Sequence, residues 1–164
     1  MSATERAHAK VGGMKILLTG ASGLLGRALM PHLALLAGTP DNLIGTAHSR
    51  LRPPLQRLDL TDDTDVRAAF AAWRPALVIH AAAERRPDQV DRAPQAAQRL
   101  NVSATALLAE LAAASGARFI YISTDYVFDG ETNISYSEDD FTNPQGVYGA
   151  SKRKGEELAL DLNP

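Results

Sequence analysis

The chain of 164 residues is 45% hydrophobic and carries a formal net charge of −2. This length suits one domain with a proper core, and the near-neutral charge offers no electrostatic footprint for nucleic acid or an anionic membrane. No apolar run approaches the ~20 residues that span a bilayer, and the absence of cysteine excludes disulfides and thiolate metal sites. We therefore expect a cytosolic globular domain that binds neither nucleic acid nor membrane and holds no metal.

Residues 1–13 contain no hydrophobic segment of the kind found in secretory signals, so we expect a disordered leader there. Residues 14–164 form the predicted folded domain. In that stretch, short β-branched runs alternate with longer alanine-rich segments, which predicts βαβ units and a parallel sheet. The expected fold is α/β, a doubly wound parallel sheet with five strands.

The predicted strands are the short apolar runs at residues 15–19, 42–47, 55–60, 76–81 and 118–123. Amphipathic segments predict helices at about residues 23–38, 62–73 and 94–115, and again from about Gly146. Between the fifth strand and the last helix, residues 124–145 are polar and rich in turn formers, which predicts a loop.

Single residues refine the helices. Pro31 predicts a kink or an early break in the first helix, and Gly38 predicts its end. Thr61 or Asp62 can cap the second helix. An apolar stripe at helical spacing marks the buried face of the third helix. The stripe consists of Leu100, Ala104, Leu107, Leu111 and Ala114.

Three glycines separate the first strand from the first helix. Gly20 can take a tight turn, Gly23 lets the backbone approach a pyrophosphate, and Gly26 lets the helix pack closely on the strand. The helix N-terminus would then offer free N–H groups and a partial positive charge to the phosphates. The sequence thus predicts a dinucleotide site, and the alternative is a tight turn that binds nothing.

The end of the second strand bears on the choice of cofactor. An NAD site usually has a carboxylate there to bind the ribose 2′-hydroxyl. This chain instead has His48, Ser49, Arg50 and Arg52. A guanidinium suits a 2′-phosphate, because its planar fork donates two hydrogen bonds. We expect NADP(H) in preference to NAD(H), the alternative being that these arginines are only solvated.

Tyr148 and Lys152 stand four residues apart, so one helical face carries both. A phenol that protonates an alkoxide near neutral pH must have its pKa lowered by about three units, or roughly 4 kcal/mol. A neighbouring ammonium group supplies part of that. Such a pair also arises by chance. Thr124, with Ser123 as second choice, could orient a carbonyl beside it, unless its hydroxyl only completes a backbone turn.

The segments "TGASGLLG" (19–26), "STDYVFDG" (123–130) and "YGASK" (148–152) resemble the dTDP-4-dehydrorhamnose reductases. These are extended short-chain reductases, which use NADPH to reduce a nucleotide-linked 4-keto sugar. The resemblance runs from about Met14 to about Glu157. It implies a catalytic set of Thr124, Tyr148 and Lys152.

The same resemblance implies a cofactor site. Its residues would be Gly20, Ser22, Gly23, Leu24, Leu25, Gly26, Ser49, Arg50, Asp59, Leu60, Ala81, Ala82, Ala83, Tyr148 and Lys152. Asp59 and Leu60 would border the adenine, and the three alanines would line the ribose.

The segment "HAAAERRPD" (80–88) is similar to the regulatory beta subunits of methionine adenosyltransferase, a branch of the same family. Two functions are therefore open. One is an NADP(H)-binding regulatory partner of that synthetase's catalytic subunit, and the other is an NADPH-dependent sugar-nucleotide reductase. The alternative for Glu84, Arg85 and Arg86 is a solvated charged loop.

A doubly wound dinucleotide fold usually has about six strands, and five are predicted here. By the resemblance, a sixth strand and a substrate-binding lobe would follow. We expect a C-terminal truncation that is inactive alone. The alternative is a homo-oligomer that covers the open edge of the fifth strand.

Overall fold

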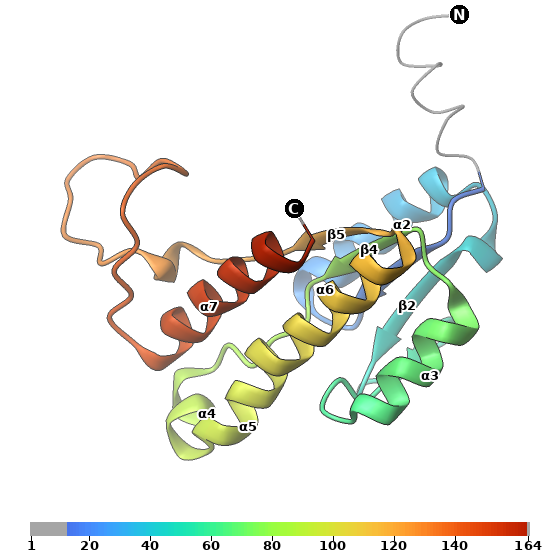
Figure 1. Ribbon diagram of the computed structural model, residues 1–164, viewed down its shortest axis with the longest axis horizontal. Coiled ribbons are helices and arrows are strands. Elements are labelled where there is room, and N and C mark those ends of the chain that lie inside the picture. Colours follow the sequence, from blue (N-terminus) through green and yellow to red (C-terminus); the bar gives the residue numbers. More distant parts are fainter. Residues whose placement is uncertain (1–12, 164) are drawn as a thin grey trace, which may run out of the picture.

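The computed structural model describes residues 13–163 (Figure 1). The leader expected over residues 1–13 lies outside the described residues except for Gly13, which is exposed in a turn. None of the described helices combines the length and the apolar character needed to cross a membrane.

Five parallel strands form one sheet in the order β3-β2-β1-β4-β5. They are β1 (Ile16–Thr19), β2 (Leu43–Ala47), β3 (Gln56–Arg57), β4 (Leu77–His80) and β5 (Arg118–Tyr121). The register sets Leu17 of β1 beside Ile44 of β2 and Val78 of β4. The predicted doubly wound α/β fold with five strands is confirmed.

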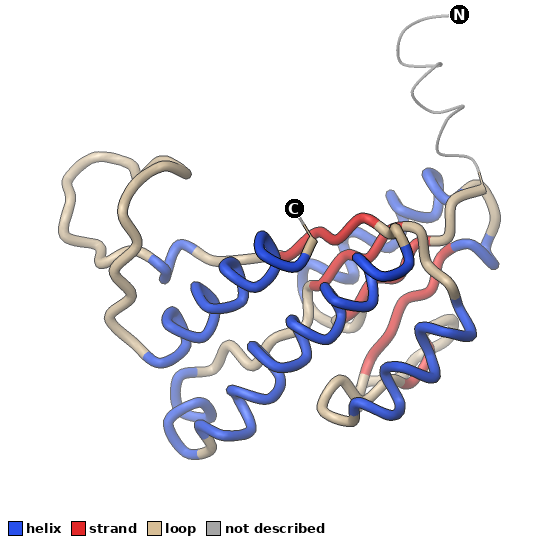
Figure 2. Tube along the Cα trace, in the orientation of Figure 1, coloured by secondary structure: helices blue, strands red, loops and turns tan. Residues whose placement is uncertain are grey.

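Helices cover both faces of the sheet (Figures 1 and 2). They are α2 (Leu24–Ala37), α3 (Asp63–Trp73), α4 (Pro87–Arg92), α5 (Pro94–Gln98), α6 (Ala104–Ser115) and α7 (Val147–Leu162). Three short turns complete the set: η1 (Pro40–Asn42) and η3 (Asp125–Val127) are 3₁₀ helices, and η2 (Arg99–Ser103) is a π-helical turn.

Alternate residues of β1 pack on opposite faces of the sheet. Ile16 and Leu18 pack with Leu33 of α2 on one face. Leu17 packs with a second cluster on the other face, which includes Phe70 of α3 and Leu108 of α6. Such two-sided burial is what a continuous apolar strand in a parallel sheet requires.

The third strand is shorter than predicted. Residues 55–60 were expected to pair, but only Gln56 and Arg57 do. The backbone N–H of Asp59 donates to the Asp65 carboxylate (2.9 Å), and the Asp59 carboxylate accepts from the N–H of Thr61 (2.9 Å). These side-chain bonds turn the chain towards α3 instead of extending the strand.

Of the kink or early break predicted at Pro31, the early break does not occur. Helix α2 runs through Pro31 and ends at Ala37, with Gly38 at φ 77° as its C-cap. Both Pro31 and Arg27, whose carbonyl loses its helical partner, lie on the exposed side. Water can therefore replace the missing hydrogen bond.

The segment expected as one helix over residues 94–115 is α5, η2 and α6 in succession, and the preceding α4 was not predicted. The apolar stripe is only partly correct. Ala104 and Leu107 are buried, whereas Ala114 is exposed and Leu108 and Ala112 are buried in its place. Helix α6 contacts α3 and α7 as well as the sheet, so its buried face is broader than one stripe.

Asp62, one of the two predicted caps, begins α3. Its Oδ1 accepts from the backbone N–H groups of Thr64 (2.9 Å) and Asp65 (3.2 Å). We expect Asp62→Ala to lower the free energy of unfolding by about 1 kcal/mol, because two N–H groups lose their acceptor. Urea denaturation measures this. Asp63→Ala removes a carboxylate from the same turn without removing the cap, and an equal loss there would contradict the assignment.

Candidate functional site

The glycine loop lies where β1 meets α2. Gly20 has a φ of 71°, and a Cβ added there would lie 2.7 Å from the backbone nitrogen of Ala82. A Cβ on Gly26 would overlap the carbonyl oxygen of Gly20. The loop is thus folded tightly against the end of β4, and only glycine permits both approaches.

The first turn of α2 is open to a ligand. Gly23 is its N-cap, without a side-chain capping bond, and no acidic residue lies in the first turn. Leu24 and Leu25 are exposed, Leu24 to 80%. The free N–H groups and the helix dipole together suit an anion such as a pyrophosphate.

A hollow of about 280 Å³ lies at the carboxyl ends of β1, β2 and β4. It brings together eight of the residues predicted to hold a cofactor. These are Gly20, Ser22, Ser49, Arg50, Asp59, Leu60, Ala82 and Ala83. The ends of parallel strands at the point where strand order reverses are the usual ligand position in such sheets.

Ala81 was also predicted to hold the cofactor, but it does not line this hollow. It packs against the apolar cluster that contains Ile16 and Leu18, under α2. Its backbone N–H donates to the carbonyl of Thr19 (3.3 Å), which extends the pairing of β4 with β1. Its side chain therefore supports the glycine loop, and only Ala82 and Ala83 of the predicted alanine triplet line the hollow.

A second hollow, of about 420 Å³, adjoins the first and is rich in arginine. Arg50 and Arg52, which the sequence predicts to favour a 2′-phosphate, line it together with Ser22 and Ser49. Arg27 also lines it, and sequence reasoning missed this residue. The signal was present, because Arg27 follows Gly26 directly in the first turn of α2.

Asp59 marks the edge of the first hollow. Hydrogen bonds from Thr61, first from its hydroxyl (2.7 Å) and then from its backbone N–H (2.9 Å), lower the pKa of the Asp59 carboxyl group. His48 Nε2 lies 3.4 Å from the other carboxylate oxygen. Asp59 therefore remains ionised well into the acid range.

Thr124, Tyr148 and Lys152 come from two segments, the end of the β5 segment and α7. Tyr148 is half-buried, and its ring meets Tyr126 edge-on with the centroids 6.0 Å apart. Burial raises the pKa of the Tyr148 phenol, while the hydrogen bond with Thr124 opposes that rise. The Thr124 oxygen also accepts from the N–H of Tyr126 (3.3 Å), so it serves the turn of η3 as well.

Lys152 is almost fully enclosed, at 3% exposure. Its Nζ donates to the carbonyl of Ile122 (2.5 Å) and lies 3.8 Å from the centroid of the Tyr121 ring. Burial lowers the pKa of Lys152 to about 8. Gly155 makes this packing possible, because a Cβ there would strike the Tyr121 hydroxyl.

Asn101, in the π-helical turn η2, is a site residue that sequence reasoning missed. It is 1% exposed, and its Nδ2 donates to the carbonyl of Glu84 (3.0 Å) and to Ser151 Oγ (3.0 Å). Its Oδ1 accepts from the N–H of Glu84 (2.8 Å). An asparagine inside an apolar helical segment was the available signal, since a buried amide must find partners.

His80 extends this polar region beneath the site. Its Nδ1 lies 2.7 Å from Thr19 Oγ1, and its Nε2 lies 3.1 Å from Thr105 Oγ1. Thr105 in turn donates to the carbonyl of Asn101 (2.8 Å). Complete burial lowers the pKa of His80 to about 3, so the imidazole is neutral at physiological pH.

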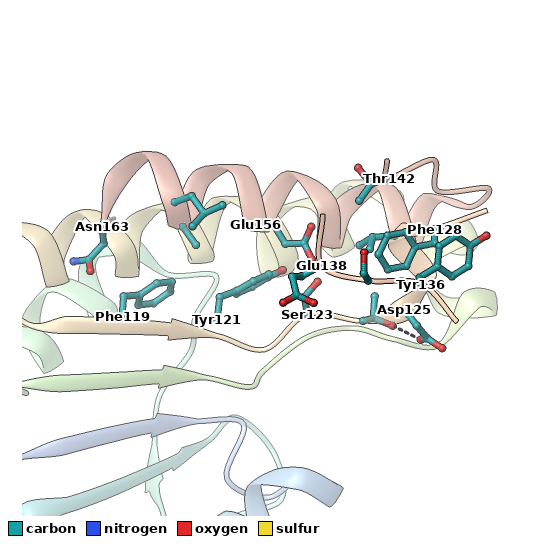
Figure 3. Close-up of a pocket in the computed structure, with 15 residues that line it drawn as sticks. Phe119, Tyr121, Ser123, Asp125, Phe128, Tyr136, Glu138, Thr142, Glu156 and Asn163 are labelled. Carbon is teal, nitrogen blue, oxygen red and sulfur yellow. Dashed lines mark hydrogen bonds between the residues drawn. The ribbon is translucent and has the colours of Figure 1, made fainter. Parts of the chain in front are cut away.

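A hollow of about 670 Å³ lies between the open edge of β5, the helix α7 and the loop that follows η3 (Figure 3). Phe119 and Tyr121 stand from β5 towards α7, and Glu138 and Glu156 lie near Ser123 (Figure 3). The Ser123 hydroxyl is buried and has no hydrogen-bond partner among the described residues. Thr124 also lines this hollow.

Residues 14–164 match the family model described as RmlD substrate binding domain. The chain is 44% identical over 149 residues to methionine adenosyltransferase 2 subunit beta from Bos taurus, covering 91% of this chain and 43% of that protein. It is 40% identical over 148 residues to dTDP-4-dehydrorhamnose reductase from Streptomyces griseus, covering 90% and 45%. The chain thus spans less than half the length of these relatives.

Solved structures of dTDP-4-dehydrorhamnose reductases share this fold. The dTDP-4-dehydrorhamnose reductase of Clostridium acetobutylicum superposes with a TM-score of 0.79 at 36% identity, over 92% of this chain and 50% of that one. The Bacillus anthracis enzyme, solved in complex with NADP, has a TM-score of 0.77 at 31% identity, over 92% and 50%.

The glycine loop can be tested by stability. We expect Gly26→Ala to lower the free energy of unfolding by about 1–3 kcal/mol, because the added methyl group overlaps the Gly20 carbonyl. Gly23→Ala is the matched control, since its Cβ would lie 3.1 Å from the same oxygen and should cost less. Equal losses in urea denaturation would show that the close approach at Gly26 is not what holds the loop.

Proposed function

This chain belongs to the RmlD substrate binding domain family, and we propose that it is the NADP(H)-binding part of a regulatory subunit of methionine adenosyltransferase. Residues 14–164 would act as one cofactor-binding domain. The proposal of cofactor binding is supported by the pair of adjoining hollows, one at the glycine loop and one lined by arginine.

The arginine-lined hollow supports NADP(H) over NAD(H). Three arginines, Arg27, Arg50 and Arg52, line it, together with Ser22 and Ser49, whose hydroxyl groups can also donate. A ribose 2′-phosphate carries the negative charge and the several acceptor oxygens that such a set recognises, whereas a 2′-hydroxyl carries no charge. Bound NADPH would supply a hydride for reduction of a carbonyl group.

The proposed partner rests on two observations. Identity to the methionine adenosyltransferase beta subunits is 43–44% over 149 residues in the Bos taurus and Rattus norvegicus proteins. The segment that suggested this branch, residues 80–88, contains Glu84, whose backbone exchanges two hydrogen bonds with the Asn101 amide, while the Arg85 and Arg86 side chains are exposed. A catalytic subunit of the synthetase is the proposed partner.

A second function is favoured by the residues around Tyr148. Thr124, Tyr148 and Lys152 are all present, and the Thr124 side chain lowers the pKa of the Tyr148 phenol against the rise caused by burial. Such a set suits an NADPH-dependent reductase of a nucleotide-linked 4-keto sugar, in which Tyr148 gives its proton to the new alkoxide.

Cofactor choice is tested by Arg50→Glu. We expect NADPH affinity to fall at least tenfold, because a charge-assisted hydrogen bond to the 2′-phosphate contributes about 1.5–3 kcal/mol, while NADH affinity stays unchanged. The fluorescence of Trp73, the one tryptophan in the chain, and the thermal stabilisation by each nucleotide measure this. Arg67→Glu on α3 applies the same charge change away from both hollows. Equal losses of NADPH and NADH affinity would contradict the proposal.

The two functions are separated by Tyr148→Phe. For a regulatory subunit, we expect co-purification with a methionine adenosyltransferase catalytic subunit, and the same yield from the variant. For a reductase, we expect NADPH oxidation with dTDP-4-dehydrorhamnose that falls by at least 100-fold in the variant, the scale of lost acid catalysis. Turnover without complex formation would overturn the regulatory proposal in favour of the reductase.

A further inference from the structure

The buried Lys152 side chain has few polar partners between α7 and the end of β5. Its Nζ donates to the carbonyl of Ile122 (2.5 Å), which engages one of the three N–H groups of an ammonium ion. Among residues 13–163, no other oxygen or nitrogen atom accepts from this amine, and no carboxylate forms an ion pair with it. Because burial disfavours a charge, the charged form of Lys152 needs a further partner.

The face of the Tyr121 ring is this further partner. Lys152 Nζ lies over the ring, 3.8 Å from its centroid. The π electrons give an aromatic ring a negative face, which attracts a cation most strongly where water is excluded. Burial raises the pKa of the Tyr121 phenol, so the ring stays neutral throughout the range in which a lysine titrates. The attraction is therefore a cation–π contact and not an ion pair.

The Tyr121 side chain is fixed in this position. It stands from β5 towards α7 (Figure 3), and its hydroxyl donates to the backbone carbonyl of Lys152 (3.4 Å). Gly155, one turn further along α7, leaves room for this hydroxyl, which a Cβ would strike. The His80 ring lies 5.8 Å from the Tyr121 ring, centroid to centroid. Tyr121 thus binds one residue of α7 at two points, the amine through its ring and the carbonyl through its hydroxyl.

The other titratable groups around Lys152 come from α7 and β4. Burial, the larger effect, lowers the pKa of Lys152, and the Glu156 carboxylate on the next turn of α7 opposes that fall. His80 of β4 has a pKa of about 3 and is neutral where the lysine titrates. Burial raises the pKa of the Tyr148 phenol on the preceding turn, so it is neutral there as well. Glu156 and the ring of Tyr121 are therefore the two groups of this set that favour the charged amine.

We propose that Tyr121 is a positioning residue that acts through Lys152: its ring face keeps the buried ammonium group charged and holds it at the end of β5. The meaning of this contact for the site rests on the proposed role of Lys152 beside Tyr148. A neutral amine could neither favour the ionised phenol nor offer a charge-assisted hydrogen bond to a cofactor. With a pKa of about 8, a fall of one pH unit would leave Lys152 about half neutral at pH 7.

A pH titration of the lysine side chains by NMR tests the proposal. The protein is labelled with ¹³C and ¹⁵N in its four lysines, and the Lys152 signal is the one that Lys152→Arg removes. We expect Tyr121→Leu to move the midpoint of Lys152 downward by about one pH unit, the scale of a cation–π contact shielded from water. Tyr121→Phe retains the ring and should retain most of the wild-type midpoint. Phe119→Leu is the control, because it removes a neighbouring ring from the same side of β5 and should leave the midpoint unchanged.

Ring fluorination separates the electrostatic effect of the ring from its packing. Phenylalanines with one, two and three ring fluorines are introduced at position 121, because fluorine withdraws electron density from the ring face and changes its size little. We expect the midpoint of Lys152 to fall with each fluorine. An unchanged midpoint across this series overturns the proposal, even where Tyr121→Leu fails to fold by circular dichroism. An equal shift in Phe119→Leu overturns it too. The titration contains neither nucleotide nor partner, so its failure would leave the proposed function standing.

Discussion

The buried side chain of Asn101 joins the two halves of the site, and the rest of the arrangement depends on it. An amide enclosed at 1% exposure must find partners for its donors and its acceptor, because leaving them unpaired costs about 1–3 kcal/mol each. Here the partners are the backbone of Glu84 on one side and Ser151 on the other. The segment after β4 and the helix that carries Tyr148 and Lys152 are thereby held in one geometry. The π-helical turn η2 is the local departure from regular helix at this residue.

Much of the fold follows from patterns that are local in the chain. The alternation of apolar strands and alanine-rich helices predicted five parallel strands, and the glycines at 20, 23 and 26 predicted the turn between β1 and α2. The errors occurred where one side chain altered the backbone. Asp65 captured the N–H of Asp59 and shortened β3, and solvent exposure let α2 continue through Pro31. Periodicity reports which face is buried, but it carries no information on which backbone group a side chain will bind.

The candidate site was predictable where its residues adjoin a motif and not where the fold brings distant residues together. Gly20 was predicted from the glycine loop, Ser49 and Arg50 from the end of the second strand, and Ser22 from the family resemblance, and one hollow contains all four. Asn101 was missed because its partners lie 17 and 50 residues away in the chain. Arg27 is the exception, because it adjoins the glycine motif and was still missed. Only the fold shows that it lines the same hollow as Arg50.

The row of hydrogen bonds that begins at Thr19 also has a direction. Thr105 gives its one hydroxyl proton to the carbonyl of Asn101, so it can only accept from His80. The neutral imidazole must then carry its proton on Nε2, and its bare Nδ1 must accept from the Thr19 hydroxyl. The tautomer of His80 is therefore dictated by a helix carbonyl on the far side of β4. All three dipoles point the same way, from the strand that precedes the glycine loop to the helix that carries Asn101, so each bond polarises and strengthens the next.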